Sequence, residues 1–136
     1  MKNQPRTSEE RNMRLLGMSW AGVDKKELQK AVRELAAEQR ADGGWSQLPS
    51  LNSDAYATGE TLVALHEAGM STNDAVYKRG VQFLLNTQQE DGSWFVRTRA
   101  IPLQPPSDSG FPYGGEQWIS AAGTNWATMA LIHAAR

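Results

Sequence analysis

The 136-residue sequence contains no cysteine and only two histidines, His66 and His133. The absence of cysteine excludes disulfides, thiolate metal ligands and thiol nucleophiles. A basic run is also lacking, because 14 Lys and Arg residues face 15 Asp and Glu residues, for a formal net charge of -1. Nucleic-acid-binding proteins usually carry a basic patch, so we expect neither DNA nor RNA as a partner.

Long apolar runs are missing as well. The N-terminal segment MKNQPRTSEER lacks the apolar stretch of a signal peptide, and no run elsewhere is long enough to cross a bilayer. We therefore expect a soluble chain without a transmembrane segment or targeting signal, in a compartment that the sequence does not indicate. A piece of a longer protein would have the same features. The length predicts one domain, residues 1–136, with a modest core.

What the sequence does contain is an internal repeat. The stretch LQKAVRELAAEQRADGGW (28–45) returns forty-nine residues later as YKRGVQFLLNTQQEDGSW (77–94). A fixed period of this size indicates one supersecondary unit used more than once. The pairs in register include Lys30 with Arg79, Ala31 with Gly80, Val32 with Val81, Leu35 with Leu84, Gln39 with Gln88, Asp42 with Asp91, Gly43 with Gly92, and Trp45 with Trp94.

Apolar periodicity and capping residues predict five helices, at about 8–21, 24–40, 54–68, 74–89 and 118–135. The third and fifth also match each other, at an offset of sixty-six residues. The repeated unit is therefore a helical hairpin. The first helix resembles the second half of such a unit, so we expect an all-α chain of roughly two and a half hairpins.

The two offsets differ because of one long segment, residues 95–116, which contains four prolines and three glycines. A loop of this length in a compact domain is usually a lid, a binding loop or a disordered segment. We expect it to lack regular structure, apart from a short extended piece at its start.

The glutamine and tryptophan of each repeat are predicted to be structural. Gln39 and Gln88 fall on the apolar stripe of a predicted helix, where an unpaired amide would cost about 1–3 kcal/mol. The Asp-Gly pairs that follow turn the chain back, so that Trp45 and Trp94 can lie against the end of the helix. We call residues 30–45 the first corner and residues 79–94 the second corner.

These residues resemble the QW motif of squalene-hopene cyclases, oxidosqualene cyclases and related terpenoid-cyclase and prenyltransferase-like repeats. The second corner matches at every position, whereas the first has Glu34 for an aromatic residue and Ala31 for a glycine. The resemblance covers most of the chain. It implies an incomplete α/α toroid, in which the glutamine and the tryptophan brace outer helices and do no chemistry.

The catalytic acid of the cyclases is not evident. In that family an aspartate of a D-x-D-D-T-A motif protonates the substrate, and the nearest match here is DAYATG, residues 54–59. Asp54 and Thr58 fit, but Tyr56 and Ala57 replace the other two aspartates. Asp54 is therefore only a weak catalytic candidate and is better explained as a helix N-cap.

Two other chemistries known in related proteins are excluded by composition. The zinc site of prenyltransferase β-subunits and the thioester of complement-like domains both need cysteine, and YGGEQ (113–117) has Gly114 at the thiol position. We therefore expect no metal and no cofactor. Both histidines are interpreted as surface or helix-terminal residues.

Aromatic side chains remain as candidates for binding a hydrophobic, isoprenoid-like ligand: Tyr56, Phe111, Tyr113, Trp118 and Trp126. At helical positions such as Trp126 the alternative is a place in the core. The favoured interpretation is a non-catalytic binding or assembly module that forms a homo-oligomer, such as a twofold dimer, or docks onto a larger chain. The alternatives are a terpenoid-cyclase-type enzyme, or a fragment of one.

Overall fold

The computed structural model describes residues 5–99, 101 and 107–136, and within these ranges all regular structure is helical. The predicted all-α fold of five main helices, consistent with part of an α/α toroid, is confirmed. The elements are α1 (Ser8–Ala21), α2 (Lys25–Ala36), α3 (Ala55–Glu67), α4 (Ala75–Thr87), a short 3-10 turn η1 (Gly114–Glu116) and α5 (Gln117–Ala134).

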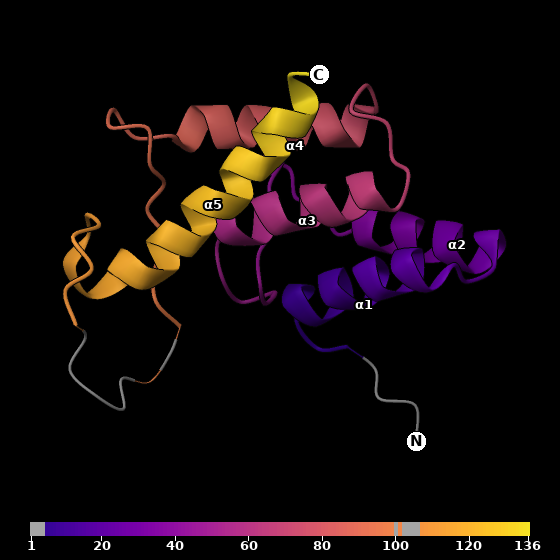
Figure 1. Cartoon of the computed structure of the whole chain (residues 1–136), viewed down its shortest axis with the longest axis horizontal. Helices are drawn as coiled ribbons and strands as arrows, with labels where there is room; N and C mark the ends of the chain where they lie inside the picture. The colour runs from indigo at the N-terminus through magenta and orange to yellow at the C-terminus, as the bar shows by residue number, and fades with distance from the viewer. Residues whose placement is uncertain (1–4, 100, 102–106) are drawn as a thin grey trace.

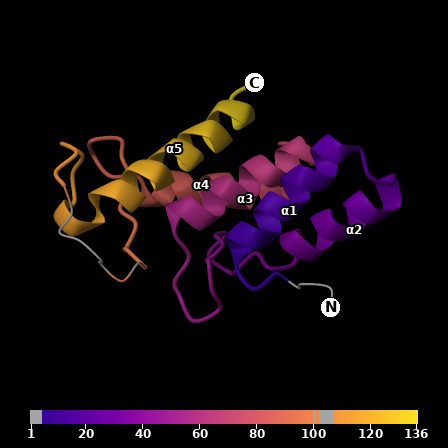
Figure 2. The same cartoon turned by 60° about the horizontal axis from the view of Figure 1, so that its bottom comes forward.

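Helix α3 lies at the centre and contacts each of the other four helices (Figures 1 and 2). Ten of its 13 residues are buried, whereas α2 buries only Leu35 fully. The crossing of α3 and α5 is close, because a Cβ atom at Gly59 would stand 2.5 Å from the backbone nitrogen of Ala127. A side chain at this glycine would therefore force the two central helices apart.

Side-chain caps start the first four helices. Thr7 and Glu10 form a capping box at the start of α1, while Asp24, Asp54 and Asp74 cap α2, α3 and α4. The side-chain oxygen of each N-cap residue accepts a hydrogen bond from a backbone N–H that has no partner within its helix. The observed starts lie within one residue of the predicted ones.

The ends of α2 and α4 differ from the prediction, because these helices stop at Ala36 and Thr87 rather than near 40 and 89. Beyond these ends the backbone enters the Asp-Gly turns instead. The N–H of Arg40 donates to the carbonyl of Gly44 at 3.0 Å, and the N–H of Gln89 donates to that of Ser93 at 2.9 Å. Main-chain hydrogen bonds within each Asp-Gly turn therefore take the place of those that a longer helix would make.

The start of the long loop is anchored to α5. Val96 is 1 % exposed, its N–H donates to the hydroxyl of Ser120 at 2.9 Å, and this hydroxyl donates back to the carbonyl of Val96 at 3.2 Å. The prolines 102, 105 and 106, to which the loop prediction partly referred, lie outside the described residues. None of the described helices is both long enough and apolar enough to span a membrane.

Candidate functional site

The two corner tryptophans make equivalent contacts. The indole Nε1 of Trp45 donates to the carbonyl of Leu35 at 3.0 Å, and that of Trp94 donates to the carbonyl of Leu84 at 2.8 Å. The backbone N–H groups of both donate to a threonine on the following helix, Thr58 in the first case. With exposures of 1 % and 2 %, both tryptophans tie α2 or α4 to the helix that follows it.

Gln39 reaches beyond its own corner to α4. Its amide nitrogen donates to the carbonyl of Gly43 at 2.9 Å and to that of Val76, in the first turn of α4, at 2.8 Å. Its amide oxygen accepts hydrogen bonds from Nε of Arg79, at 3.0 Å, and from Nη2. The nitrogen and the oxygen of the Gln39 amide thus both attach the first corner to α4.

Among the described residues, the side chain of Gln88 makes only the hydrogen bond to its own turn. Its amide nitrogen donates to the carbonyl of Gly92 at 2.9 Å, as Gln39 does to Gly43, but the side chain is exposed. The predicted burial of the Gln88 amide is therefore wrong. In the described ranges, no helix covers Gln88 in the way that α4 covers the first corner.

The turn glycines show the same difference. Gly43 and Gly92 both have positive φ, 86° and 84°, which favours glycine in these Asp-Gly turns. A Cβ atom at Gly43 would stand 2.5 Å from the carbonyl oxygen of Arg79, whereas at Gly92 the nearest atom would be Nε2 of Gln88 at 3.9 Å. The surface of the first corner is covered by α4, and that of the second corner is open.

A groove of about 480 Å³ lies between α1 and α2, and its lining includes Leu15 and Ala31. The corresponding positions between α3 and α4 are Leu62 and Gly80, because Leu15 and Leu62 each precede the left-handed glycine after their helix by seven residues. A Cβ atom at Gly80 would contact both Leu62, at 2.8 Å, and Trp45, at 3.1 Å. The groove is therefore the equivalent of the surface on which the first corner rests.

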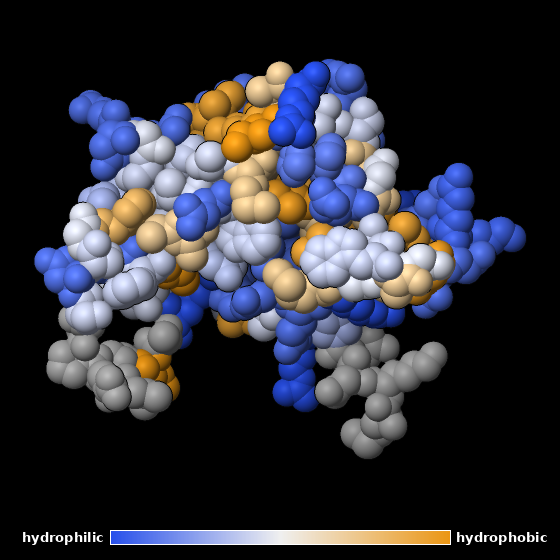
Figure 3. Space-filling model, viewed as in Figure 1, coloured by the Kyte–Doolittle hydropathy of each residue, from blue (hydrophilic) through white to orange (hydrophobic). Residues whose placement is uncertain are grey.

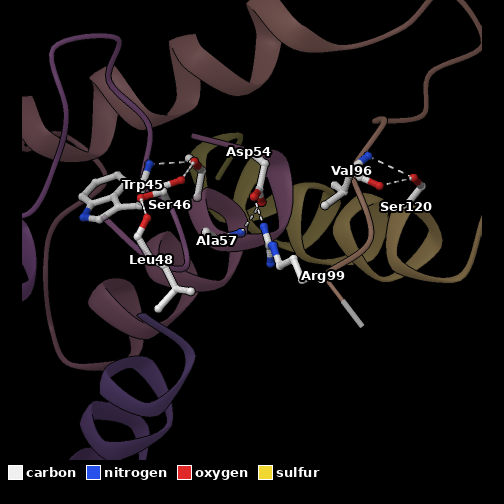
Figure 4. Close-up of polar contacts among 9 residues, drawn as sticks. Trp45, Ser46, Leu48, Asp54, Ala57, Val96, Arg99 and Ser120 are labelled. Atoms are coloured by element: carbon white, nitrogen blue, oxygen red, sulfur yellow. Dashed lines mark hydrogen bonds and ion pairs between the residues drawn. The ribbon is translucent and has the colours of Figure 1, made fainter. Parts of the chain in front are cut away.

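Asp54 uses both of its carboxylate oxygens (Figure 4). Oδ1 accepts the N–H of Ala57 at 2.9 Å and so caps α3, while Oδ2 forms an ion pair with the guanidinium of Arg99. Both side chains are about one-sixth exposed, at 16 % and 17 %. They line a cleft of about 620 Å³ together with residues 50–53, Phe95, Arg97, Thr98 and Glu116.

Arg99 belongs to the residues that the sequence analysis missed. Nothing in the sequence signals that an arginine of the long loop would reach the N-cap of α3, forty-five residues away. Its guanidinium also lies over the ring of Tyr56, 5.8 Å from the centroid. Burial lowers the pKa of Arg99 from its usual value, and nearby Glu9 opposes that shift.

A second missed group is a buried carboxyl in the middle of α3. Glu60 is 0 % exposed, and its Oε2 accepts a hydrogen bond from the Asn12 amide at 2.8 Å. Within the part of the chain that the structure describes, its Oε1 has no hydrogen-bond partner. Burial raises the pKa of Glu60 to about 7, although the bond from Asn12 lowers it. A visible signal was present in the sequence, because Glu60 is the one charged residue at positions 55–65, which are otherwise apolar, small or aromatic.

The five aromatic candidates do not form one cluster. Phe111 and Tyr113 are in contact, with centroids 6.3 Å apart, and Tyr113 also packs edge-on against Phe95 at 5.4 Å. Tyr56 and Trp126 are half-buried on α3 and α5, where both pack against the core. Trp118 is 55 % exposed, and its indole donates to the carbonyl of Ser107 at 3.0 Å.

Tyr113 has a positive φ of 86°, which is unusual for a residue with a side chain. Tyr113 is the N-cap residue of η1, and its hydroxyl is hydrogen-bonded to that of Ser93. In the YGGEQ stretch Gln117 is buried, and its amide oxygen accepts a bond from the hydroxyl of Ser109 at 2.6 Å. The bond between Ser109 and Gln117 joins the end of the long loop to the first residue of α5.

Comparison with known proteins identifies related sequences. The profile of the family described as squalene-hopene cyclase C-terminal domain matches residues 8–136. A squalene-hopene cyclase of Bradyrhizobium diazoefficiens is 36 % identical over 93 residues, which cover 59 % of this chain and 14 % of that protein. A probable squalene-hopene cyclase of Sinorhizobium fredii is 32 % identical over 109 residues, which cover 77 % of this chain and 16 % of that protein. The chain thus spans about one-sixth or less of the relatives' length.

Proposed function

Because the chain belongs to the squalene-hopene cyclase C-terminal domain family, we propose that it is a non-catalytic assembly module built from that family's helical hairpins. The observation that carries the proposal is the difference between Gln39, docked on α4, and Gln88, exposed in the same local geometry. The partner that we propose for the open corner is a second copy of this chain.

The surroundings of Asp54 and Glu60 support a non-catalytic role. Asp54 is engaged at both oxygens, by the N–H of Ala57 and by Arg99, so a proton on either one would displace a contact. Glu60 has the raised pKa that an acid requires, but with 0 % exposure it offers no surface to a substrate. Neither carboxyl therefore combines access with a free proton.

Complementary surfaces support assembly between copies. On one side are the Gln88 corner and exposed apolar side chains of α4 and α5, which include Leu85 at 50 % and Ile132 at 48 % exposure. Apolar surface is visible over the C-terminal end of α5, at the top of Figure 3. On the other side are the α1–α2 groove and Lys30, the counterpart of Arg79. Lys30 of a second copy would supply a cation to the amide oxygen of Gln88.

This pairing is head-to-tail, since two different surfaces meet. Such contacts continue from copy to copy until they close into a ring or extend as a filament. A twofold dimer would instead join two identical edges. The two arrangements give different results when variants of opposite surfaces are mixed.

Two variants test the proposal. Leu85→Lys disrupts the α4 edge, and Ala31→Arg fills the groove, while each leaves the other surface intact. We expect the wild type to associate in light scattering at micromolar concentrations, each variant alone to be monomeric, and an equimolar mixture to form a 1:1 heterodimer. A wild type that is strictly monomeric would reject assembly between copies. Association of one variant alone, without rescue on mixing, would point to a twofold contact.

The names of the two relatives favour a second candidate function, the cyclisation or binding of an isoprenoid such as squalene. The proposed place for such a ligand is the cleft beside Asp54 and Arg99. Phe95 lines this cleft, Tyr113 packs against Phe95, and Phe111 contacts Tyr113. Incubation with squalene, or with a prenyl diphosphate, followed by product extraction tests it. A cyclised product that is lost in Asp54→Asn would overturn the non-catalytic proposal.

A further inference from the structure

The C-terminal ends of α3 and α5 bring together the two histidines of the sequence. His66 lies in the last turn of α3 and His133 in the last turn of α5. Their rings are stacked, with centroids 4.1 Å apart and an interplanar angle of 17°. Residues sixty-seven positions apart thus form a pair that no sequence pattern indicates.

A carboxylate completes the group. Glu67 follows His66 directly, and its Oε1 is 3.8 Å from Nδ1 of His66. One ligand atom from each of His66, Glu67 and His133 lies within 4.8 Å of the other two. In addition, Nδ1 of His66 is buried and has no hydrogen-bond partner among the described residues. An imidazole nitrogen that is neither solvated nor hydrogen-bonded is costly unless something else occupies it.

From this geometry we propose that His66, Glu67 and His133 form a binding site for a divalent transition-metal ion, of which Zn²⁺ is the representative case. Two imidazoles and one carboxylate are a ligand set that Zn²⁺ accepts, with water in the fourth position. The ion would connect the last turns of α3 and α5, and so clasp the two central helices. This site is separate from the corners and from the Asp54 cleft.

The distances require a small adjustment. Ligands at about 2.0–2.1 Å from a tetrahedral ion stand ~3.3 Å apart, less than the 4.8 Å that bounds the present group. The stacked rings must therefore turn toward a common point. Glu67 is exposed and His133 is half-buried, so both side chains have room to rotate. The backbone of Glu67 is fixed meanwhile, because its carbonyl accepts the hydroxyl of Ser19 at 2.8 Å.

Local electrostatics favour a cation here. The last turn of a helix carries the negative end of its dipole, and two such ends meet at this group. Burial, and then the neighbouring His66, lower the pKa of His133, which favours the neutral imidazole that a metal needs. Glu67 acts in the opposite direction on this pKa, and Arg136 is a nearby positive charge that opposes a metal ion.

The test uses the tag-free chain titrated with Zn²⁺ alone. We expect 1:1 binding in calorimetry, a higher unfolding temperature that a chelator reverses, and perturbation of both imidazole signals in NMR spectra. With only two histidines, one substitution assigns these signals. His133→Ala is expected to raise the Kd at least about tenfold, and Glu67→Gln to raise it while preserving side-chain size. Binding should weaken on acidification, because protons compete for the imidazoles.

The matched control is Glu90→Gln, which removes an exposed carboxylate far along the chain and should leave the Kd unchanged. The proposal is overturned if Zn²⁺ neither binds nor raises the unfolding temperature of the wild type. It is equally overturned if His133→Ala, shown to be folded by circular dichroism, binds Zn²⁺ as tightly as the wild type. Imidazole signals that stay unperturbed at saturating Zn²⁺ would have the same meaning.

Discussion

Arg79 donates a hydrogen bond from its Nε to the amide oxygen of Gln39, 3.0 Å away, and thereby joins the end of one outer helix to the start of the next. The equivalent positions at the other end of the repeat are Lys30, on α2, and Gln88, after α4. Over the residues that the structure describes, no hydrogen bond joins Lys30 to Gln88. The contact between glutamine and cation is thus made once within the chain, by Gln39 and Arg79. The corresponding residues Gln88 and Lys30 lie at separate surfaces.

The first prediction concerns the unequal weight of the two glutamines. Gln39→Ala removes bonds to Gly43, Val76 and Arg79, so it should lower the free energy of unfolding by about 1–3 kcal/mol. Gln88→Ala, at an exposed position, should change it by no more than about 0.5 kcal/mol in the monomer. Urea denaturation of both variants at low protein concentration measures the difference. Equal costs would contradict the proposed division between a docked and an open corner.

The second prediction concerns the tryptophans, which should be equally important at both corners. Trp94→Ala removes a side chain that is 2 % exposed together with its bond to Leu84, and should cost about 3 kcal/mol or more. Trp45→Ala should cost a similar amount. Trp20, at 74 % exposure, is the matched control, and its replacement by alanine should have little effect. A thermal midpoint that Trp94→Ala leaves unchanged would remove the structural interpretation of the motif.

The repeat was readable from the sequence because the hairpin uses the same residues for the same contacts each time. The Asp-Gly turns recur at a fixed spacing together with Trp45 and Trp94. This spacing can be read from the sequence without knowing where each helix ends. The exposure of Gln88 could not be read in this way, since it depends on which helix lies next to it. Sequence periodicity predicted a buried stripe at both glutamines, and only the first has a neighbour that covers it.

The candidate sites were harder to predict for a related reason. The ion pair of Asp54 with Arg99, the bond of Glu60 with Asn12 and the stack of His66 on His133 all join residues more than forty positions apart. No local pattern encodes such pairs, because they arise from the way in which α1, α3, α5 and the long loop pack. A capping residue acts within four positions, so the N-cap role predicted for Asp54 was accessible from the sequence, and the structure confirms it.

The third prediction is a pH dependence of stability that originates at Glu60. Burial raises its pKa in the folded chain to about 7, from the usual 4.5. The folded state then binds more protons than the unfolded state between these two values, so stability is full below about pH 4.5 and falls as the pH rises toward 7. The shift corresponds to a loss of about 3 kcal/mol across this window.

Glu60→Gln isolates that effect. The amide oxygen can still accept the Asn12 bond, but the side chain no longer ionises, so the variant should be more stable than the wild type at pH 8 and lack the decline from pH 5 to 8. Urea denaturation at several pH values measures both curves, with the exposed Glu90→Gln as control. If the wild type and Glu60→Gln show the same pH profile, Glu60 is not the origin of the dependence.

The last prediction separates the two roles of Asp54. Asp54→Ser retains an oxygen that can cap α3 but loses the ion pair, whereas Asp54→Ala loses both and should cost about 1 kcal/mol more. The pair itself is measured by a double-mutant cycle with Arg99→Ala, for which we expect a coupling energy of about 0.5 kcal/mol or more at this mostly buried position. Equal stability of Asp54→Ser and Asp54→Ala would exclude the cap as a contributor. A coupling energy of zero would mean that Arg99 leaves Asp54 free, and the carboxylate would then return as a candidate acid in the cleft.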